Sequence, residues 1–293
     1  MKNILVFADY YYPGIKAGGP AKSIYNLINN LSSYYNFNLV TRNKDLGEKD
    51  SYYNIINDKW INEKTYSLIY LNNSYEIFKI IKIICNKPFD IMYLNSFFSF
   101  KYSIIPILLI NILKRKRKYI ICAPRGEFAL SALGNNYNKK HLFIYISKMI
   151  GLYNNVKWHA TSKHELIDIK KYMGDSINVK LAPIISTFPK INLKQKIRKN
   201  KNHLSILFLS RIVKIKNLDY SLEIISKLKG NIIFNIYGPI EDKKYWKLCK
   251  KLISELPSNI TCKYQRIATH DDLPGIFNKH HLFILPSKGE NYG

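Results

Sequence analysis

Cysteine is scarce in this sequence, and the few cysteines lie far apart. Four of the 293 residues are cysteines: Cys85, Cys122, Cys249 and Cys262. No CxxC pair and no Cys/His spacing typical of a metal site occurs, which argues against a structural zinc site. The cysteine usage is typical of a reduced, cytoplasmic chain.

The sequence also lacks a long apolar run and a secretion signal. A helix that spans a bilayer needs about 20 apolar residues, and the most hydrophobic stretch, SIIPILLINIL at residues 103–113, is shorter than that. We expect this stretch to form a helix of the core. The first residues, MKNILVFADYYYPG, have the pattern of a strand and a loop, without the apolar segment and cleavage site of a signal peptide.

Acidic residues are few compared with basic residues. The sequence has 20 Asp and Glu against 46 Lys and Arg, which gives a net charge of +26. Such a charge suits anionic partners, including nucleic acid, an acidic membrane surface and phosphorylated substrates. However, the chain is also rich in Asn, Ile and Tyr, a pattern expected from an AT-biased coding sequence, which enriches Lys without a functional reason. The charge alone therefore does not identify a partner.

A basic nucleic-acid-binding protein is one alternative function. Its cations should cluster on one face with interleaved aromatic residues. Here the cations are spread over predicted helices and loops, and the sequence has no RNA- or DNA-binding motif. We therefore expect no nucleic-acid partner.

The chain is long and apolar enough for two folded domains. Its residues are 47% hydrophobic and 14% aromatic, which excludes general disorder, and roughly 100 to 200 residues make one domain. Strand-length apolar runs alternate with segments of helical period, which predicts an α/β fold with parallel sheets. A polar, strongly basic segment without periodicity marks a boundary. The predicted domains are residues 1–185, a basic linker at 186–203, and residues 204–293.

A glycine pair lies in the loop after the first predicted strand. Gly18 and Gly19 precede a helix that has Pro20 near its first turn. Without side chains, these glycines would let a phosphate or a sugar approach the free N–H groups of the helix. A tight turn without a ligand is the alternative. The pattern is not GxGxxG, so it does not favour a dinucleotide-dependent dehydrogenase.

A proline–arginine–glycine turn follows the predicted strand at residues 119–123. It presents Arg125, Gly126 and Glu127 at the carboxyl end of that strand, where an α/β protein binds its ligand. These residues are candidates for contacts to a donor or an acceptor substrate. A structural turn with a surface ion pair between Arg125 and Glu127 is the alternative.

Two further features have structural explanations. Ser162 and Glu165 form an S-x-x-E capping box, so Glu165 is better explained by helix capping than by catalysis. Five cations at residues 114–118 follow the apolar helix predicted at residues 97–113, where they would complement the helix dipole. The alternative for this second feature is a basic patch that contacts an anionic membrane.

The second predicted domain opens with a strand, a cationic loop and a helix. Leu204–Leu209 is an apolar run of strand length, and a helix with Asn217 as its N-cap follows the loop. Arg211 and Lys216 therefore emerge at the carboxyl end of a parallel strand and beside a helix N-terminus, a position that favours anions. A solvated basic loop is the alternative.

Two more strand ends in this domain carry candidate residues. Gly238 and Pro239 follow the predicted strand at residues 231–237. The last strand leads to SKGENYG at residues 287–293, where Glu290 stands between glycines. A carboxylate in this position can accept hydrogen bonds from sugar hydroxyls, and the neighbouring N–H groups can face anionic oxygens.

These segments resemble the motifs of family-4-type retaining glycosyltransferases, the "glycosyl transferases group 1". FLSRIVKIKNLDYSLEII is similar to their diphosphate-binding segment, with Ser210 where glycine is commoner. The loop with Gly18 and Gly19, the Pro-Arg-Gly turn and LPSKGENYG also resemble family motifs and occur in the family's order. The histidine that many relatives carry near the Pro-Arg-Gly turn is absent. The second glutamate of the family's E-x7-E motif would fall at position 298, beyond the sequence given.

The resemblance implies the GT-B fold, with two Rossmann-like domains facing a cleft and a second domain that is truncated here. It implies a hexosyltransferase that moves a sugar from a nucleotide-diphosphate sugar to a saccharide or lipid-linked acceptor with retention of configuration, in bacterial capsule, O-antigen or lipopolysaccharide synthesis. Arg211 and Lys216 would hold the diphosphate and Glu290 the donor sugar. The other implied substrate contacts are Gly18, Gly19, Arg125, Gly126, Glu127, Gly238, Pro239, Asn291, Tyr292 and Gly293.

The resemblance also implies that neither a cofactor nor a metal ion takes part, and no Asp-x-Asp metal motif occurs. We expect a cytoplasmic enzyme that can contact the anionic inner face of the membrane peripherally. The alternative to an active enzyme is an inactive or partner-dependent fragment of such a glycosyltransferase.

Overall fold

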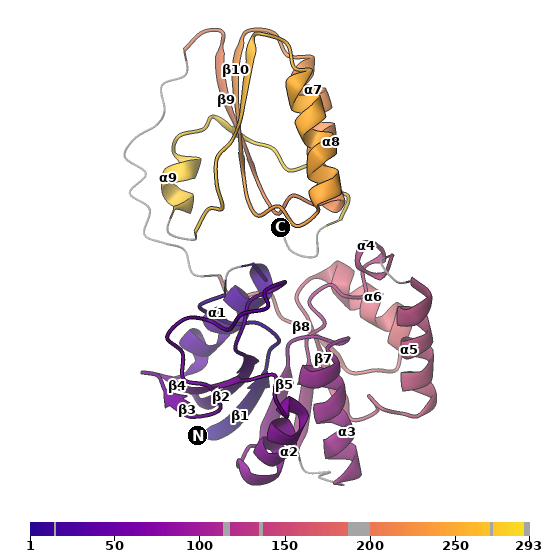
Figure 1. Ribbon diagram of the computed structural model, residues 1–293. Helices are drawn as coiled ribbons and strands as arrows, with labels where there is room; N and C mark the ends of the chain where they lie inside the picture. The colour runs from indigo at the N-terminus through magenta and orange to yellow at the C-terminus, as the bar shows by residue number, and fades with distance from the viewer. Residues whose placement is uncertain (15, 114–117, 135–136, 187–199, 270–271, 290–293) are drawn as a thin grey trace. The chain divides into compact units, whose positions relative to one another are not determined.

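The computed structural model describes residues 1–14, 16–113, 118–134, 137–186, 200–269 and 272–289 (Figure 1). These residues form two compact α/β units, the first within residues 1–186 and the second within residues 200–289. Each unit has its own sheet and its own buried core.

The first unit is built on an eight-stranded sheet in which every neighbouring pair is parallel except β3 with β4. The strand order is β3-β4-β2-β1-β5-β6-β7-β8, so the chain changes direction across the sheet between β1 and β5. Open α/β sheets bind ligands at the carboxyl ends of the strands at such a switch point. The strands are β1 (Lys2–Phe7), β2 (Tyr35–Arg42), β3 (Trp60–Asn62), β4 (Tyr66–Leu71), β5 (Ile91–Leu94), β6 (Tyr119–Cys122), β7 (Val156–Ala160) and β8 (Val179–Leu181).

Helices cover both faces of this sheet, which explains why its central strands are continuously apolar. On β1, Leu5 belongs to one buried cluster and Val6 to the other. Helix α1 packs in the cluster of Val6, whereas α2, α3, α5 and α6 pack in the cluster of Leu5. The helices are α1 (Gly19–Leu31), α2 (Glu76–Asn86), the π-helical turn η1 (Phe100–Ile104), α3 (Ile105–Ile112), α4 (Leu130–Leu133), α5 (Tyr137–Met149) and α6 (Lys163–Met173).

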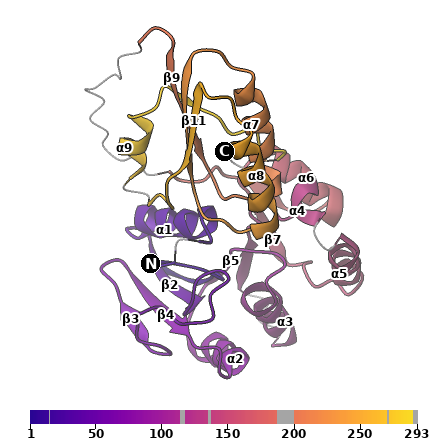
Figure 2. The same ribbon diagram turned by 45° about the horizontal axis from the view of Figure 1, so that its top comes forward.

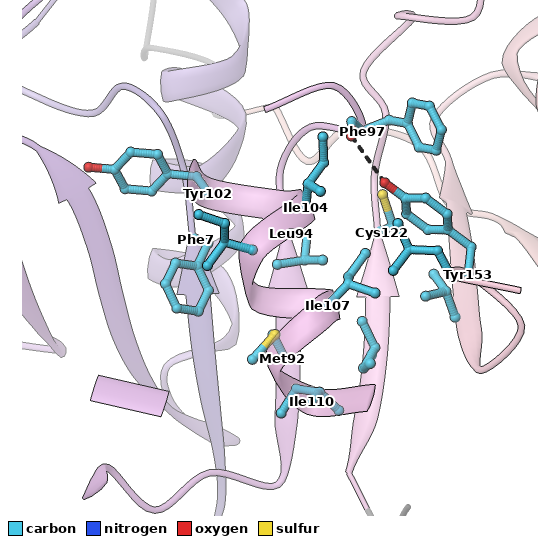
Figure 3. Close-up of a cluster of buried hydrophobic side chains, with 14 of the residues drawn as sticks. Phe7, Met92, Leu94, Phe97, Tyr102, Ile104, Ile107, Ile110, Cys122 and Tyr153 are labelled. Atoms are coloured by element: carbon cyan, nitrogen blue, oxygen red, sulfur yellow. Dashed lines mark hydrogen bonds between the residues drawn. The ribbon is translucent and has the colours of Figure 1, made fainter. Parts of the chain in front are cut away.

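The hydrophobic stretch at residues 103–113 lies largely in η1 and α3 and is part of the core, as predicted. Ile107 and Ile110 of α3 are buried near Met92 and Leu94 of β5 (Figure 3). In the same cluster, the hydroxyl of Tyr153 donates a hydrogen bond of 3.3 Å to a backbone carbonyl. Among the described residues, no helix is both long enough and apolar enough to cross a membrane.

The second unit has a four-stranded parallel sheet with the order β11-β10-β9-β12. The chain changes direction across this sheet between β9 and β12, so its switch point lies at the carboxyl ends of these two strands. Helices α7 and α8 lie side by side in both views (Figures 1 and 2) and pack into one buried cluster with β9 and β10. The elements are β9 (His203–Leu209), η2 (Lys214–Lys216), α7 (Leu218–Ser226), β10 (Asn231–Tyr237), α8 (Lys243–Ser254), β11 (Ile260–Tyr264), α9 (Leu273–Phe277) and β12 (Leu282–Phe283).

Helix α7 begins after Asn217, as predicted, but it is capped by another side chain. Asn217 has a positive φ of 60° and makes no side-chain capping bond, so the prediction that its side chain caps the helix was wrong. The backbone N–H of Asp219 instead donates to the hydroxyl of Tyr245 in α8 at 3.0 Å, and this hydroxyl donates to the Asp219 carboxylate at 2.6 Å. A cap supplied by a residue 26 positions away could not be read from the local pattern.

Candidate functional site

The loops after β9 and β10 remain paired beyond the ends of their strands. The N–H of Ser210 donates to the carbonyl of Tyr237 at 3.0 Å, and the N–H of Ile212 donates to the carbonyl of Pro239 at 2.8 Å. An isolated bridge between Ile212 and Ile240 continues the parallel pairing. These bonds continue the pairing of β9 and β10 into the loops at the carboxyl edge of the sheet.

Gly238 is required at this edge because two backbones approach closely. Its φ is +136°, and a Cβ built there would lie 1.9 Å from the carbonyl oxygen of Ser210. Its N–H donates to the carbonyl of Arg266 at 3.1 Å, and its carbonyl accepts from the hydroxyl of Tyr264 at 3.0 Å. The predicted pair of Gly238 and Pro239 therefore shapes the edge through the backbone.

Arg211 lies on the loop after β9 and forms an ion pair across to the loop after β10. Its Nη1 is 3.0 Å from Oε2 and 3.3 Å from Oε1 of Glu241. The side chain of Arg211 is 44% exposed and that of Glu241 is 27% exposed. A pair with this much solvent contact contributes only about 0 to 1 kcal/mol, so an anionic ligand can take the place of Glu241.

Lys216 ends the short helix η2, two residues before the start of α7. The same loop contacts the segment after β12, because the N–H of Lys288 donates to the carbonyl of Ile215 at 2.9 Å. The structure thus brings Arg211, Lys216 and Lys288 to one edge, at the switch point between β9 and β12. Lys288 was not singled out from the sequence, because only the topology shows that its strand is the neighbour of β9.

A second ion pair lies near the carboxyl end of β11 in this unit. Arg266 donates to Asp272 through Nη1 at 2.8 Å and Nη2 at 2.6 Å, and Thr269 donates to the same carboxylate. Arg266 therefore already forms a bidentate ion pair within the chain. Glu290, Asn291, Tyr292 and Gly293, which the sequence predicts to contact the donor, lie outside the described residues.

In the first unit, the candidate glycines stand at the start of α1. Gly18 has a φ of +65° and ψ of −128°, a conformation that favours glycine. No described atom other than chain neighbours lies within 4 Å of the Cβ position of Gly18 or Gly19. Among the described residues, the space beside this helix N-terminus is therefore open, and the carbonyl of Pro20 accepts from the amide of Asn95 at 3.4 Å.

Arg125 is held by neutral partners in a chain of hydrogen bonds along the same edge. Its Nε donates to Oδ1 of Asn95 at 2.7 Å, and its Nη2 donates to the hydroxyl of Tyr93 at 2.9 Å. Tyr93 in turn contacts Nδ1 of His159 at 2.8 Å, and Nε2 of His159 is 2.8 Å from the carbonyl of Ala182. The alternative of a surface ion pair with Glu127 was wrong, since Arg125 and Glu127 make no ion pair.

The contacts of His159 define its tautomer. A carbonyl oxygen only accepts, so Nε2 carries the proton toward Ala182 and Nδ1 accepts from the hydroxyl of Tyr93. Burial lowers the pKa of His159, the hydrogen bond to Ala182 opposes part of this shift, and the nearby charge of Arg125 adds to it. The imidazole is therefore neutral, and it orients Tyr93 toward Arg125. Sequence reasoning gave His159 no role, because its partners come from other strands.

The carboxylates of Glu127 and Glu165 hold the Pro-Arg-Gly turn in place through hydrogen bonds. The carboxylate of Glu127 accepts from Ser96 Oγ at 2.7 Å and from the N–H groups of Phe97 at 2.6 Å and Phe98 at 3.1 Å. Burial raises the pKa of Glu127 to about 7, although these hydrogen bonds act in the opposite direction. Both of its oxygens thus face donors of the protein.

The carboxylate of Glu165 fixes the backbone of the turn. It accepts from the N–H of Gly126 at 2.7 Å and from both the N–H and the hydroxyl of Thr161. The N–H of Glu165 donates to Ser162 Oγ at 3.1 Å, so the predicted capping by Ser162 is confirmed. Among the residues that the structure describes, no group of three or more His, Cys, Asp or Glu side chains is arranged to hold a metal ion.

Comparisons with known proteins agree with this architecture. Residues 189–293 match the family model described as Glycosyl transferases group 1. No curated protein sequence matches the chain. The structure is similar to that of HepE from Anabaena, solved with UDP-glucose, with a TM-score of 0.66 and 11% identity over 99% of this chain and 75% of HepE.

Two further solved structures show the same likeness. WaaG, a glycosyltransferase involved in lipopolysaccharide biosynthesis, has a TM-score of 0.60 and 12% identity over 99% of this chain and 76% of WaaG. A glycosyltransferase from Rickettsia africae has a TM-score of 0.60 and 14% identity over 98% of this chain and 73% of its own. At these identities the likeness shows the fold. The predicted fold class, an α/β chain of the GT-B type with Rossmann-like units, is confirmed.

Proposed function

We propose that this chain is a glycosyltransferase that moves a sugar from a nucleotide-diphosphate sugar to a saccharide or lipid-linked acceptor, with retention of configuration. The observation that carries the proposal is the cationic edge of the second unit, where Arg211 and Lys216 lie on the loop after the central strand β9. The family match at residues 189–293 and the UDP-glucose bound to HepE, a protein of the same fold, support it.

The proposed role of Arg211 and Lys216 is to stabilise the leaving group. Breaking the bond between the sugar and the diphosphate leaves negative charge on the diphosphate. A guanidinium with forked donors and an ammonium, both fixed at a strand end, can neutralise this charge as it develops. The N–H of Asp219 is already bound by Tyr245, so this donor of the first turn of α7 is not available to the diphosphate. We propose that the positive charges of Arg211 and Lys216 take the role that a metal ion has in other transferases.

The remaining predicted contacts divide between the two units. Glu290, which follows the second unit in the sequence, is proposed to orient the donor sugar, and Asn291, Tyr292 and Gly293 are proposed as further donor contacts. In the first unit, the open space at Gly18 and Gly19 and the guanidinium of Arg125 are proposed to receive the acceptor. Glu127 and Gly126 would act through the turn that presents Arg125, because their polar atoms are bound within the protein.

A screen of nucleotide sugars by thermal shift tests this function. Uridine, guanosine, adenosine, cytidine and thymidine diphosphate sugars cover the common donors, and a ligand at about 100 times its Kd stabilises the folded state by about 2.7 kcal/mol. We expect one nucleotide to raise the unfolding temperature and Arg211→Ala to reduce the shift. A shift with an oligonucleotide but with none of the nucleotide sugars would favour nucleic-acid binding. Donor binding without transfer would favour the inactive or partner-dependent fragment.

We also propose a peripheral contact with the anionic inner face of the cytoplasmic membrane, consistent with a role in surface polysaccharide synthesis. The exposed apolar side chains of α5 and of the residue that follows it form a surface that we call the α5 surface: Leu142, Tyr145, Ile146, Met149 and Ile150, each between 41% and 68% exposed. No acidic residue occurs between Phe128 and His164, whereas Lys139, Lys140 and Lys148 lie on the same helix. An exposed apolar helix face flanked by lysines suits an anionic bilayer.

The structure describes the α5 surface, whereas it does not describe most of the basic patch considered from the sequence. Most of α3 is buried in the core, and its exposed apolar side chains, Ile112 and Leu113, lie at its end. The cations Lys114–Arg117 lie outside the described residues. The membrane contact is therefore proposed at α5.

A further inference from the structure

The proposed diphosphate ligand Arg211 is already paired with a carboxylate of its own chain. Glu241 lies 3.0 Å from its guanidinium, on the loop after the neighbouring strand. Neither the family motifs nor the sequence pattern drew attention to Glu241. Because a diphosphate and a carboxylate both seek the same guanidinium, the two anions compete for Arg211.

The backbone keeps Glu241 in this position. The residue before it, Ile240, forms a bridge with Ile212, and the N–H of Asp242 donates to the carbonyl of Ile212 at 3.3 Å. Asp242 also caps α8, since its carboxylate accepts from the N–H of Tyr245 at 2.9 Å. Glu241 is thus anchored on both sides and remains near Arg211 when a ligand arrives.

The surrounding charges leave Glu241 as the acid that opposes an anionic ligand. In the loops at residues 210–217, 238–242 and 284–289, the described cations are Arg211, Lys214, Lys216 and Lys288. The acids in these loops are Glu241 and Asp242, and the carboxylate of Asp242 is committed to α8. Glu241 occupies the Arg211 guanidinium, so a diphosphate that binds Arg211 has to displace it and loses the free energy of that ion pair.

We propose that Glu241 is a built-in counter-ion that holds Arg211 in the free protein and weakens the binding of the nucleoside diphosphate, so that the product leaves more readily. The inference rests on the proposed function, because it requires that Arg211 binds the diphosphate. Glu241 is a positioning residue that acts through Arg211. It makes the site bind the diphosphate less tightly than its cations alone would.

Calorimetric titration with nucleoside diphosphates tests the inference. The probe is whichever of UDP, GDP, ADP, CDP and dTDP binds the full chain most tightly. We expect Glu241→Gln to lower its Kd about threefold, the effect of one exposed charge pair, and to lose this gain at high salt, because the effect is Coulombic. In the double variant Glu241→Gln/Arg211→Ala, the Kd should equal that of Arg211→Ala.

A matched control separates this local effect from a change in net charge. Glu223→Gln removes the same charge from an exposed pair with Lys227 on α7, away from the edge, and should leave the Kd unchanged.

If Glu241→Gln leaves the Kd unchanged or raises it while Arg211→Ala weakens binding, the inference is overturned and the proposed function stands. If no diphosphate binds, or Arg211→Ala changes nothing, both are overturned. A gain that persists at high salt or in the Arg211→Ala background also overturns the inference.

Discussion

The α-carbon of Gly238 lies so close to the carbonyl oxygen of Ser210 that a Cβ built on it would be 1.9 Å away. This contact joins the strand ends that carry the proposed donor site, since Arg211 follows Ser210 directly. The edge therefore tolerates no side chain at position 238. The backbone determines the geometry of this edge, and the charged side chains are attached to that backbone.

Replacing Gly238 should destabilise the second unit. Gly238→Ala combines the clash with Ser210 and a φ of +136°, and we expect the free energy of unfolding to fall by at least about 3 kcal/mol. The control is Gly275→Ala in α9, whose Cβ position is open and whose φ is not positive, and this change should shift stability by less than about 1 kcal/mol. Urea unfolding of both variants measures the difference. Equal stability of the two variants would contradict the structure at this edge.

Removing either proposed diphosphate ligand should slow catalysis. Arg211→Ala and Lys216→Ala each delete a charge-assisted contact to phosphate, and we expect turnover to fall at least about tenfold. Lys227→Ala removes an exposed cation from the C-cap position of α7 in the same unit and should leave turnover unchanged. Release of the nucleoside diphosphate, followed in a coupled assay, measures all three variants. Unchanged donor kinetics in both Arg211→Ala and Lys216→Ala would contradict the assignment.

Glu127 should make the first unit less stable as the pH rises. Burial raises its pKa to about 7 in the folded state, whereas a solvent-exposed glutamate has a pKa of about 4.5. The folded state therefore binds the proton more tightly, and the stability that the protonated carboxyl contributes is lost between about pH 4.5 and pH 7. The loss can reach about 3 kcal/mol.

Urea unfolding at pH 5 to 8 measures this loss. Glu127→Gln cannot titrate, so its stability should fall less than that of the wild type across this range. Glu223→Gln, which removes an exposed carboxylate, should follow the wild-type profile. Parallel profiles for the wild type and Glu127→Gln would show that Glu127 is ionised in both states.

The α5 surface should govern binding to anionic vesicles. The triple variant Leu142→Ser/Tyr145→Ser/Met149→Ser removes three exposed apolar side chains, and we expect its partitioning onto phosphatidylcholine–phosphatidylglycerol vesicles to fall at least about tenfold. The control Tyr53→Ser/Phe78→Ser removes side chains that are 89% and 70% exposed elsewhere and should bind as the wild type does. Equal sedimentation of all three proteins with the vesicles would contradict the contact.

The sequence predicted the parts of the fold that depend on local patterns. The continuous apolar run of β9 indicates a parallel strand that is buried on both faces. Arg211 and Lys216 follow this strand, so they are predicted to lie at the carboxyl edge of the sheet, where α/β proteins bind ligands. The antiparallel strand β3 lies in a polar, Asn-rich segment, and its short, half-exposed sequence carries no strand pattern.

The partners within the site could not be predicted, because they come from distant segments. Glu241 follows Arg211 by 30 positions, and only the pairing of the loops after β9 and β10 shows that they meet. The chain from Arg125 through Tyr93 to His159 likewise joins three neighbouring strand ends. The order of the strands in the sheet determines which of these residues are in contact, and this order cannot be predicted from the periodicity of any single element.

A crystal structure of the chain with its preferred nucleoside diphosphate tests the donor site most directly. We predict that the phosphate oxygens lie within hydrogen-bonding distance of the Arg211 guanidinium and the Lys216 ammonium, at the carboxyl ends of β9 and β12, and that Glu241 has released Arg211. A diphosphate bound elsewhere, with Arg211 still paired to Glu241, would contradict the proposed function.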